Sequence, residues 1–147
     1  MARYRADIPS PKTPEAAFEY LARFSNAVEW DPTVVRAEMV TPAPVGRGSA
    51  FELVIRSGRR ESTWRYEIIE HDPPQRVVLR AERGALVSED TIPVRPAPNG
   101  GSIATYDADL RLRGLLRIAD PLLAIAFRRL GDRAAAGLRR ELAGGTA

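Results

Sequence analysis

The chain has 147 residues, of which 44% are apolar and 28% charged, and this composition is typical of a globular protein with one hydrophobic core. It contains no cysteine and a single histidine, which excludes disulfides, thiolate chemistry and cysteine-ligated metals. The net charge of +3 comes from 22 basic residues, nearly all arginine, scattered among 19 acidic ones, and this pattern favours a solvated surface over a nucleic-acid interface.

Targeting and cofactor signals are missing from the sequence. No apolar run approaches the roughly 18 residues of a membrane span, and the first eleven residues lack the apolar segment of a secretion signal. No glycine-rich phosphate loop, metal-ligand spacing or Ser–His–Asp pattern is present. We therefore expect a single cytoplasmic domain over residues 1–147, with no cofactor, no metal, no nucleic-acid partner and no stable membrane insertion.

The N-terminal part predicts one strand and two short helices. Residues 2–8 alternate and predict a strand, which the prolines after them should end. A helix over residues 13–24 follows, because its threonine can cap the first turn and its proline suits the first helical position. A shorter helix over residues 27–30 should end at Asp31, because the residue before a proline is disfavoured in helices.

The middle of the chain predicts a series of strands. Apolar and polar residues alternate in segments separated by short, Gly- and Pro-rich connections, and such connections pair consecutive strands antiparallel as a meander. The polar alternate positions indicate that only one face of the sheet is covered. The predicted strands are residues 34–41, 49–57, 61–71, 76–82, 86–94 and 102–113.

The C-terminal third, residues 120–143, predicts a long helix. Asp120 can cap it, and glycines at positions 144 and 145 end it. At 1.5 Å per residue it is roughly 35 Å long, and its apolar stripe needs a broad apolar surface. We therefore predict an α+β fold in which a curved antiparallel sheet of six to seven strands wraps around this helix. The stripe comprises Leu123, Phe127, Leu130, Ala134, Leu138 and Leu142.

The alternation also predicts which strand residues face the long helix. Asp107 and Asp109 fall on the outward face of the last strand, and His71 falls at a strand end, where we expect an exposed turn. Gly131 and Gly137 interrupt the long helix, and either a close approach of the sheet or a ligand, or room for a bulky residue such as Trp64, would explain them. The predicted inward residues are Phe51, Leu53, Ile55, Trp64, Tyr66, Ile68, Val77, Leu79, Ala81, Tyr106, Ala108, Leu110 and Leu112.

The strand over residues 86–94 permits two arrangements. If Leu86 faces inward, then Ser88 and Asp90 do too, and their polar atoms need partners or water inside the protein. Alternatively, a bulge shifts the register and Asp90 lies on the surface. The sequence leaves both arrangements open.

The order of strand, two helices, six antiparallel strands and one long helix resembles the helix-grip fold of the START-like superfamily. Within it, the chain is similar to the small bacterial SRPBCC proteins of the polyketide cyclase/dehydrase and lipid-transport group. The resemblance implies a cavity between sheet and helix that holds an apolar or aromatic small molecule. It rests on Phe18 to Pro32 with Trp30-Asp31-Pro32, Val45 to Phe51, Tyr66 to Pro74, Tyr106 to Leu112, Gly114, Asp120-Pro121 and Leu138 to Leu142.

The candidate site is this cavity, which should take a lipid- or polyketide-like molecule. Its tyrosines and tryptophans offer hydrogen-bond donors to a bound carbonyl or phenol. The same aromatic residues also suit an ordinary core, and the sequence leaves both interpretations open. The candidate ligand-binding residues are Trp30, Phe51, Leu53, Trp64, Tyr66, Leu79, Asp90, Tyr106, Leu123, Phe127 and Leu130.

Three functional hypotheses follow. The first is binding of a hydrophobic small molecule. The second is a polyketide cyclase or aromatase that folds its substrate by shape and polarises a carbonyl; the lack of an evident acid–base pair weighs against it, and paired buried carboxylates would revive it. The third is a homodimeric protein-interaction module, which predicts a collapsed cavity and a large apolar surface patch.

Overall fold

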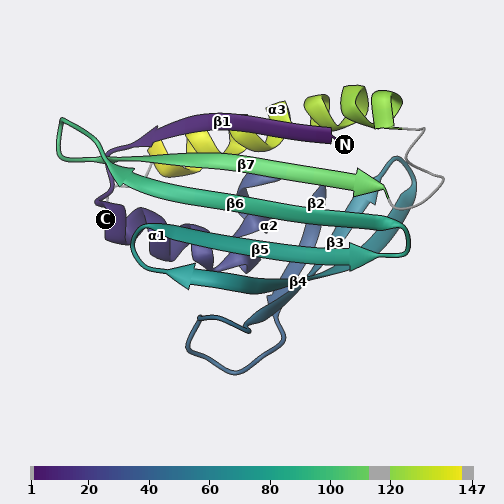
Figure 1. The fold of residues 1–147 in the computed structure, drawn as a ribbon, viewed down its shortest axis with the longest axis horizontal. Coiled ribbons are helices and arrows are strands. Elements are labelled where there is room, and N and C mark those ends of the chain that lie inside the picture. Colours follow the sequence, from purple (N-terminus) through teal and green to yellow (C-terminus); the bar gives the residue numbers. More distant parts are fainter. Residues whose placement is uncertain (1, 113–119, 144–147) are drawn as a thin grey trace.

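The computed structural model describes the backbone of residues 2–112 and 120–143, and the side chains of these residues except 120–126. One sheet and one long helix dominate the fold (Figure 1). The elements are β1 (Ala2–Ser10), α1 (Pro14–Ala22), the 3-10 helix η1 (Phe24–Asn26), α2 (Ala27–Trp30), β2 (Val34–Met39), β3 (Ala50–Ser57), β4 (Arg60–Asp72), β5 (Arg76–Arg83), β6 (Leu86–Pro96), β7 (Ser102–Leu112) and α3 (Asp120–Ala143).

The sheet has seven antiparallel strands in the order β1-β7-β6-β5-β4-β3-β2. Strands β2 to β7 form the predicted meander, and β1 pairs with the last strand, so that β1 and β2 are the two edges. Helix α3 runs along β1, and it also contacts β7 and α2 (Figure 1). This arrangement confirms the predicted helix-grip fold of an α+β protein.

Element boundaries agree with the sequence except at a few ends. Strand β1 continues through Pro9 to Ser10, so the expectation that the prolines end it after Ile8 was wrong. The reason is that β1 is an edge strand, where a residue without an N–H leaves no ladder partner unsatisfied. The first helix begins as predicted, with the Ala16 N–H donating to Thr13 Oγ1 at 3.2 Å, but it ends at Ala22, and η1 follows it.

The core lies between the inner face of the sheet and the helices. The predicted alternation is confirmed on β3 to β5, where inward side chains such as Leu53, Ile68 and Leu79 are buried. On α3 the buried residues include Leu138 and Leu142 of the predicted stripe. The end of α3 is also fixed by a hydrogen bond, because the Ser10 hydroxyl of β1 donates to the Leu142 carbonyl at 3.0 Å.

The two glycines of α3 mark places where the helix backbone is in close contact with other elements. A Cβ on Gly137 would overlap the backbone carbonyl of Trp30 in α2. A Cβ on Gly131 would overlap the ring of Tyr4 in β1. Each of the two explanations that the sequence left open therefore applies at one glycine. Gly131 leaves room for a bulky strand residue, which is Tyr4 rather than Trp64, and Gly137 permits a close approach, which is that of α2 rather than of the sheet or a ligand.

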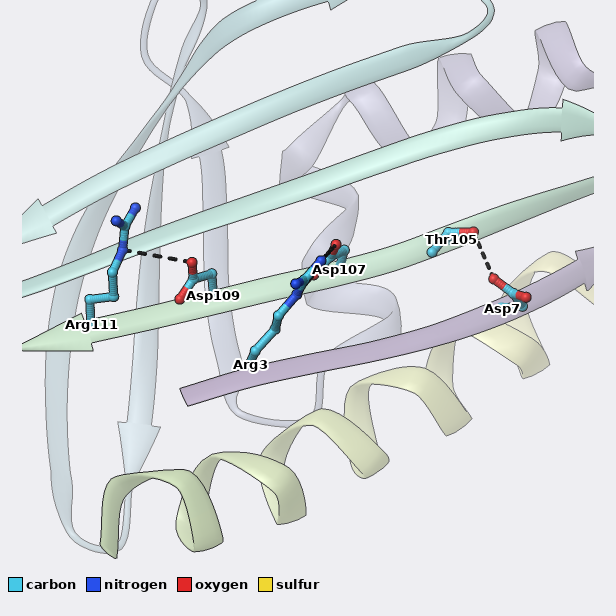
Figure 2. A network of polar contacts seen from close by, with 6 residues as sticks. All are labelled: Arg3, Asp7, Thr105, Asp107, Asp109 and Arg111. Atoms are coloured by element: carbon cyan, nitrogen blue, oxygen red, sulfur yellow. Dashed lines mark hydrogen bonds and ion pairs between the residues drawn. The ribbon is translucent and has the colours of Figure 1, made fainter. Parts of the chain in front are cut away.

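The outer face of β1 and β7 carries a row of polar contacts (Figure 2). The guanidinium of Arg3 donates to both carboxylate oxygens of Asp107, at 2.9 and 2.7 Å. The Thr105 hydroxyl donates to Asp7 at 2.7 Å, and Arg111 Nε lies 3.6 Å from Asp109 Oδ2. These contacts confirm that Asp107 and Asp109 face outward. Those of Arg3 and Asp7 also tie the edge strand β1 to β7. Within the described ranges, no helix is apolar and long enough to cross a bilayer.

Candidate functional site

A pocket of about 150 Å³ lies between α3 and the inner face of the sheet, and η1 and α2 form its third wall. The walls are mainly aromatic and aliphatic, with a few polar groups among them. The lining residues are Phe24, Ala27, Trp30, Asp31, Thr33, Val34, Leu53, Ile55, Trp64, Tyr66, Ser88, Asp90, Tyr106, Leu110, Phe127, Leu130, Gly131 and Ala134.

Most of the residues singled out from the sequence lie on this wall. They are Trp30, Leu53, Trp64, Tyr66, Asp90, Tyr106, Phe127 and Leu130. Among the described residues, Phe51 and Leu79 lie outside the pocket wall: both are fully buried, and the ring of Phe51 packs against that of Phe24. The side chain of Leu123 is outside the described residues. The residues that face inward therefore form two groups: those that line the pocket and those that fill the core.

The inner end of the pocket is a cluster of aromatic rings. Trp30, held by the short helix α2, is 2% exposed, and its ring lies 5.6 Å from that of Tyr106 and 6.0 Å from that of Phe24, both edge to face. The ring of Phe24 lies 5.0 Å from that of Tyr66. Such tilted packing gives the pocket a rigid apolar end, because aromatic pairs prefer these geometries.

The mouth of the pocket is formed by apolar side chains that are partly in contact with solvent. Trp64 and Phe127 are half-buried, and Leu130 is 43% exposed. The indole N–H of Trp64 donates to the Ser62 hydroxyl at 3.0 Å, so this donor is already engaged and does not point freely toward a guest. Trp64 therefore offers the pocket mainly its ring surface.

Asp90 is the most unusual polar group on the wall. It is 4% exposed, and the pairing of β6 with β5 and β7 keeps one register through this position. The alternative with a bulge and a surface Asp90 is therefore wrong, and Asp90 faces the interior. Among the described residues, no group forms a hydrogen bond with its carboxyl.

Burial is the main cause of an altered acidity at this carboxyl, and it raises the pKa of Asp90 to about 8. The negative charges of Asp31, Asp107 and Glu89 act on this pKa in the same direction. At neutral pH most Asp90 side chains are therefore protonated and neutral. A carboxylic acid in this state can donate a hydrogen bond into the pocket.

Two buried tyrosines face the same space. The Tyr66 hydroxyl and the Ser88 hydroxyl form a buried hydrogen bond of 2.8 Å, in which either can be the donor. Burial raises the pKa of both Tyr66 and Tyr106, and the carboxyl of Asp90 is the next largest cause of each rise. Both phenols therefore stay protonated. Ser88 was recognised in the sequence only through sharing a strand face with Asp90.

Asp31 is a wall residue that the sequence indicated only as a turn. Its carboxylate accepts hydrogen bonds from the Thr33 N–H at 2.9 Å and the Thr33 hydroxyl at 2.8 Å, which is the expected turn geometry. Burial raises the pKa of Asp31, while these two hydrogen bonds act to lower that pKa. The signal that could have found it is its position directly after the pocket residue Trp30.

His71 lies away from this pocket. It belongs to β4 and is half-buried, with its ring 5.4 Å from that of Phe18, so the expectation of an exposed turn was wrong. It lines a second, surface hollow between α1 and the loops that contain Pro44 and Pro74. In the described part of the chain, no group of three acidic or histidine side chains could hold a metal ion.

Solved structures share this fold over nearly the whole chain. TTHA0849 from Thermus thermophilus has a TM-score of 0.76 at 17% identity, with 95% of this chain and 96% of that chain covered. A START superfamily protein from Mycobacterium smegmatis has a TM-score of 0.78 at 10% identity, with 97% of each chain covered. At these identities the likeness shows the fold alone.

A third similar structure is the di-domain ARO/CYC StfQ from the steffimycin biosynthetic pathway, with a TM-score of 0.71 at 15% identity. The alignment covers 97% of this chain and 50% of StfQ, so this chain spans about half of that protein. No curated protein matches the sequence. The family described as polyketide cyclase/dehydrase and lipid transport matches residues 1–143. Since this match spans nearly all of the sequence, the chain belongs to that family.

Proposed function

We propose that the protein binds a small, mainly apolar molecule in the pocket under α3. The observation that carries the proposal is the aromatic wall around about 150 Å³ of space, with the polar groups of Asp90, Tyr66 and Ser88 at one side. Apolar contact would supply most of the binding free energy, and the few polar groups would orient the guest.

The size of the pocket limits what fits inside it. A protein cavity of about 150 Å³ lined by apolar side chains holds a molecule of the size of benzene, whereas pockets for drug-sized ligands span roughly 300–1,000 Å³. We therefore expect one aromatic ring inside, either as a whole ligand or as the end of a lipid- or polyketide-like molecule. The rest of a larger molecule would leave through the mouth between Trp64, Phe127 and Leu130.

Tryptophan fluorescence tests the proposal directly. The chain has two tryptophans, Trp30 and Trp64, and both line the pocket. Titration with toluene should therefore give a saturable change in emission, and a long-chain fatty acid or a two-ring aromatic compound should compete with it. No saturable change with any of these probes would contradict the proposed function.

A pair of alanine variants separates the pocket wall from the core. Trp64→Ala should weaken toluene binding at least tenfold and cost little stability, because half-buried Trp64 lines the mouth. Phe51→Ala is the control, and it should destabilise the fold by about 3–5 kcal/mol, as expected for a fully buried phenylalanine. Chemical denaturation gives the stabilities. Equal unfolding by both variants, with unchanged toluene affinity in Trp64→Ala, would place Trp64 in the core instead.

A cyclase or aromatase is the second candidate function. The observation in its favour is that two carboxyl groups, Asp90 and Asp31, line one pocket beside Tyr66 and Tyr106, with neutral donors available to polarise a carbonyl. Turnover of an aromatic polyketide precursor that is lost in Asp90→Asn would support an enzyme. Binding of such a precursor without turnover would leave the first proposal as the better account.

A further inference from the structure

The described wall of the pocket has carboxyl groups and no compensating cation. Among the described lining residues, Asp31 and Asp90 carry carboxyl groups and none is lysine, arginine or histidine. Asp90 is almost fully buried and, within the described residues, has no hydrogen-bond partner, so one of its oxygens is free to meet a guest. Most buried carboxyl groups are paired, and an unpaired one that faces a cavity points to a ligand.

The groups around Asp90 make the surroundings negative from several elements. Tyr66 on β4 and Tyr106 on β7 share the pocket with it, and Asp31 lies on the segment after α2. On the outer face of the sheet, Asp107 of β7 and Glu89 of β6 add negative charge near Asp90. The described pocket residues of α3 are uncharged: Phe127, Leu130, Gly131 and Ala134.

The nearest cations to these outer carboxylates are on the other face of the sheet. Arg3 forms its two hydrogen bonds with Asp107, and Arg80 lies 3.7 Å from Glu89. Both arginines are substantially exposed there. Both interact on the outer face and do not line the pocket, so the part of the interior that the structure describes has carboxyl groups and aromatic rings but no positive partner.

Aromatic faces complete the arrangement. Trp30, Trp64, Tyr66 and Tyr106 line the same small volume as the two carboxyl groups. The face of an aromatic ring attracts a cation within about 6 Å, and indole attracts it most strongly. An acidic group surrounded by such rings is the chemistry that recognises an organic ammonium group.

We propose that the pocket selects an organic cation, namely an amine joined to one aromatic ring or a short apolar chain, with its ammonium group against Asp90 and the rings of Trp30 and Tyr106. This inference rests on the proposed function, since it names the class of molecule that the same pocket takes. A neutral molecule of the same shape would bind more weakly, and an anion would be rejected.

Binding of the cation involves a proton. The amine enters as ammonium and keeps its proton, while the Asp90 carboxyl gives its own proton to solvent and becomes the carboxylate partner. No other bond changes. Because the pKa of Asp90 is about 8 in the empty pocket, the apparent affinity for the cation should rise about tenfold per pH unit from pH 6 toward pH 8 and then level off.

Three single-ring probes of similar size test the inference: benzylamine, benzyl alcohol and benzoate. Titration calorimetry at pH 7 should give an affinity for benzylamine at least tenfold above that for benzyl alcohol, with no measurable binding of benzoate. Repeating the benzylamine titration in buffers of different ionisation enthalpy should show release of nearly one proton. Benzyl alcohol should release none, and its affinity should not vary with pH.

Two variants test whether Asp90 causes the preference for benzylamine over benzyl alcohol. Asp90→Asn should bind benzylamine no more tightly than benzyl alcohol, with no proton release, while binding of the alcohol is retained. Glu89→Gln, one residue away on the outer face, should keep the preference for the amine. Equal or tighter binding of the alcohol by the unmodified protein, or a preference that survives in Asp90→Asn, would overturn the inference. If neither the alcohol nor toluene binds at all, the proposed function itself fails, and the inference falls with it.

Discussion

Asp90 shows how burial changes the chemistry of one side chain. Its position in the middle of β6, on the inner face of the sheet, removes it from water, and its near neighbours add negative charge. Both effects disfavour the carboxylate, and for this reason the pKa of Asp90 rises to about 8. The folded protein therefore holds a proton on this residue that the unfolded chain, with an ordinary aspartate, loses near pH 4.

The first prediction concerns the pH dependence of stability. Between roughly pH 4 and pH 8 the folded state binds one more proton at Asp90 than the unfolded state does, so this residue lowers the free energy of unfolding as pH rises through that window. Asp90→Asn removes the effect, because asparagine resembles the protonated acid. The stability difference, Asn variant minus unmodified protein, should increase from pH 5 to pH 8 by up to about 1.4 kcal/mol per pH unit.

Urea denaturation at pH 5, 6, 7 and 8 measures this difference. The control is Glu89→Gln, whose partly exposed side chain on the outer face should change stability by less than about 0.5 kcal/mol at each pH. A difference for Asp90→Asn that stays constant across the range would show that Asp90 is not held protonated by the fold.

At the level of elements, the position of α3 is set by close backbone contacts at its glycines. At Gly137 the helix backbone meets the carbonyl of Trp30, and at Gly131 it meets the ring of Tyr4. Glycine normally weakens a helix by about 1 kcal/mol relative to alanine, so both positions give up intrinsic helix stability for close packing. These contacts hold α3 against α2 and β1.

Gly137→Ala tests this explanation. The added methyl group would overlap the backbone of α2, which cannot rotate away as a side chain can, so we expect a net loss of about 1–3 kcal/mol despite the better helix propensity of alanine. Thermal or chemical denaturation provides the measurement. Ala136→Gly, at the adjacent exposed position, is the control for propensity and should cost about 1 kcal/mol. A Gly137→Ala variant as stable as the unmodified protein would show that α2 and α3 can separate freely.

In the whole molecule, the sheet and α3 meet tightly on one side and leave a pocket on the other. Helix α3 packs on β1, β7 and α2 (Figure 1). The pocket lies between α3 and the inner faces of β3, β4, β6 and β7. The difference can be followed along α3 itself, where Ala134 lines the pocket and its neighbour Ala135 is fully buried away from the pocket wall.

Two leucine substitutions test whether there is free space beside Ala134 and none beside Ala135. Ala134→Leu should place its side chain in the pocket, reduce toluene affinity at least tenfold and cost less than about 1 kcal/mol. Ala135→Leu should overpack a filled region and destabilise the protein by about 1–3 kcal/mol or more, with binding unaffected in the molecules that remain folded. Similar stability losses in both variants would mean that the space beside Ala134 is not available.

Local patterns in the sequence were sufficient for most of the elements and for most of their faces. Alternation gave the strands and placed Leu53, Ile68 and Leu79 inward, because successive side chains of a strand point to opposite faces. Thr13 and the proline that follows it identified the start of α1, because a helix cap depends only on residues within one turn. The predicted end of β1 after Ile8 was wrong because the sequence does not say which strand will be an edge, where Pro9 is tolerated.

The sequence by itself thus determined the α+β architecture and most of the inward side chains. Only the tertiary structure decided that Asp90 is inside, that Trp64 and Tyr66 meet a pocket while Phe51 and Leu79 meet solid core, and that Asp31 joins the wall. The physical reason is that facing inward is a property of one strand. The presence of space beyond a side chain depends on where α3 and α2 lie, and contacts between residues distant in the sequence, such as Gly137 with Trp30, fix that position.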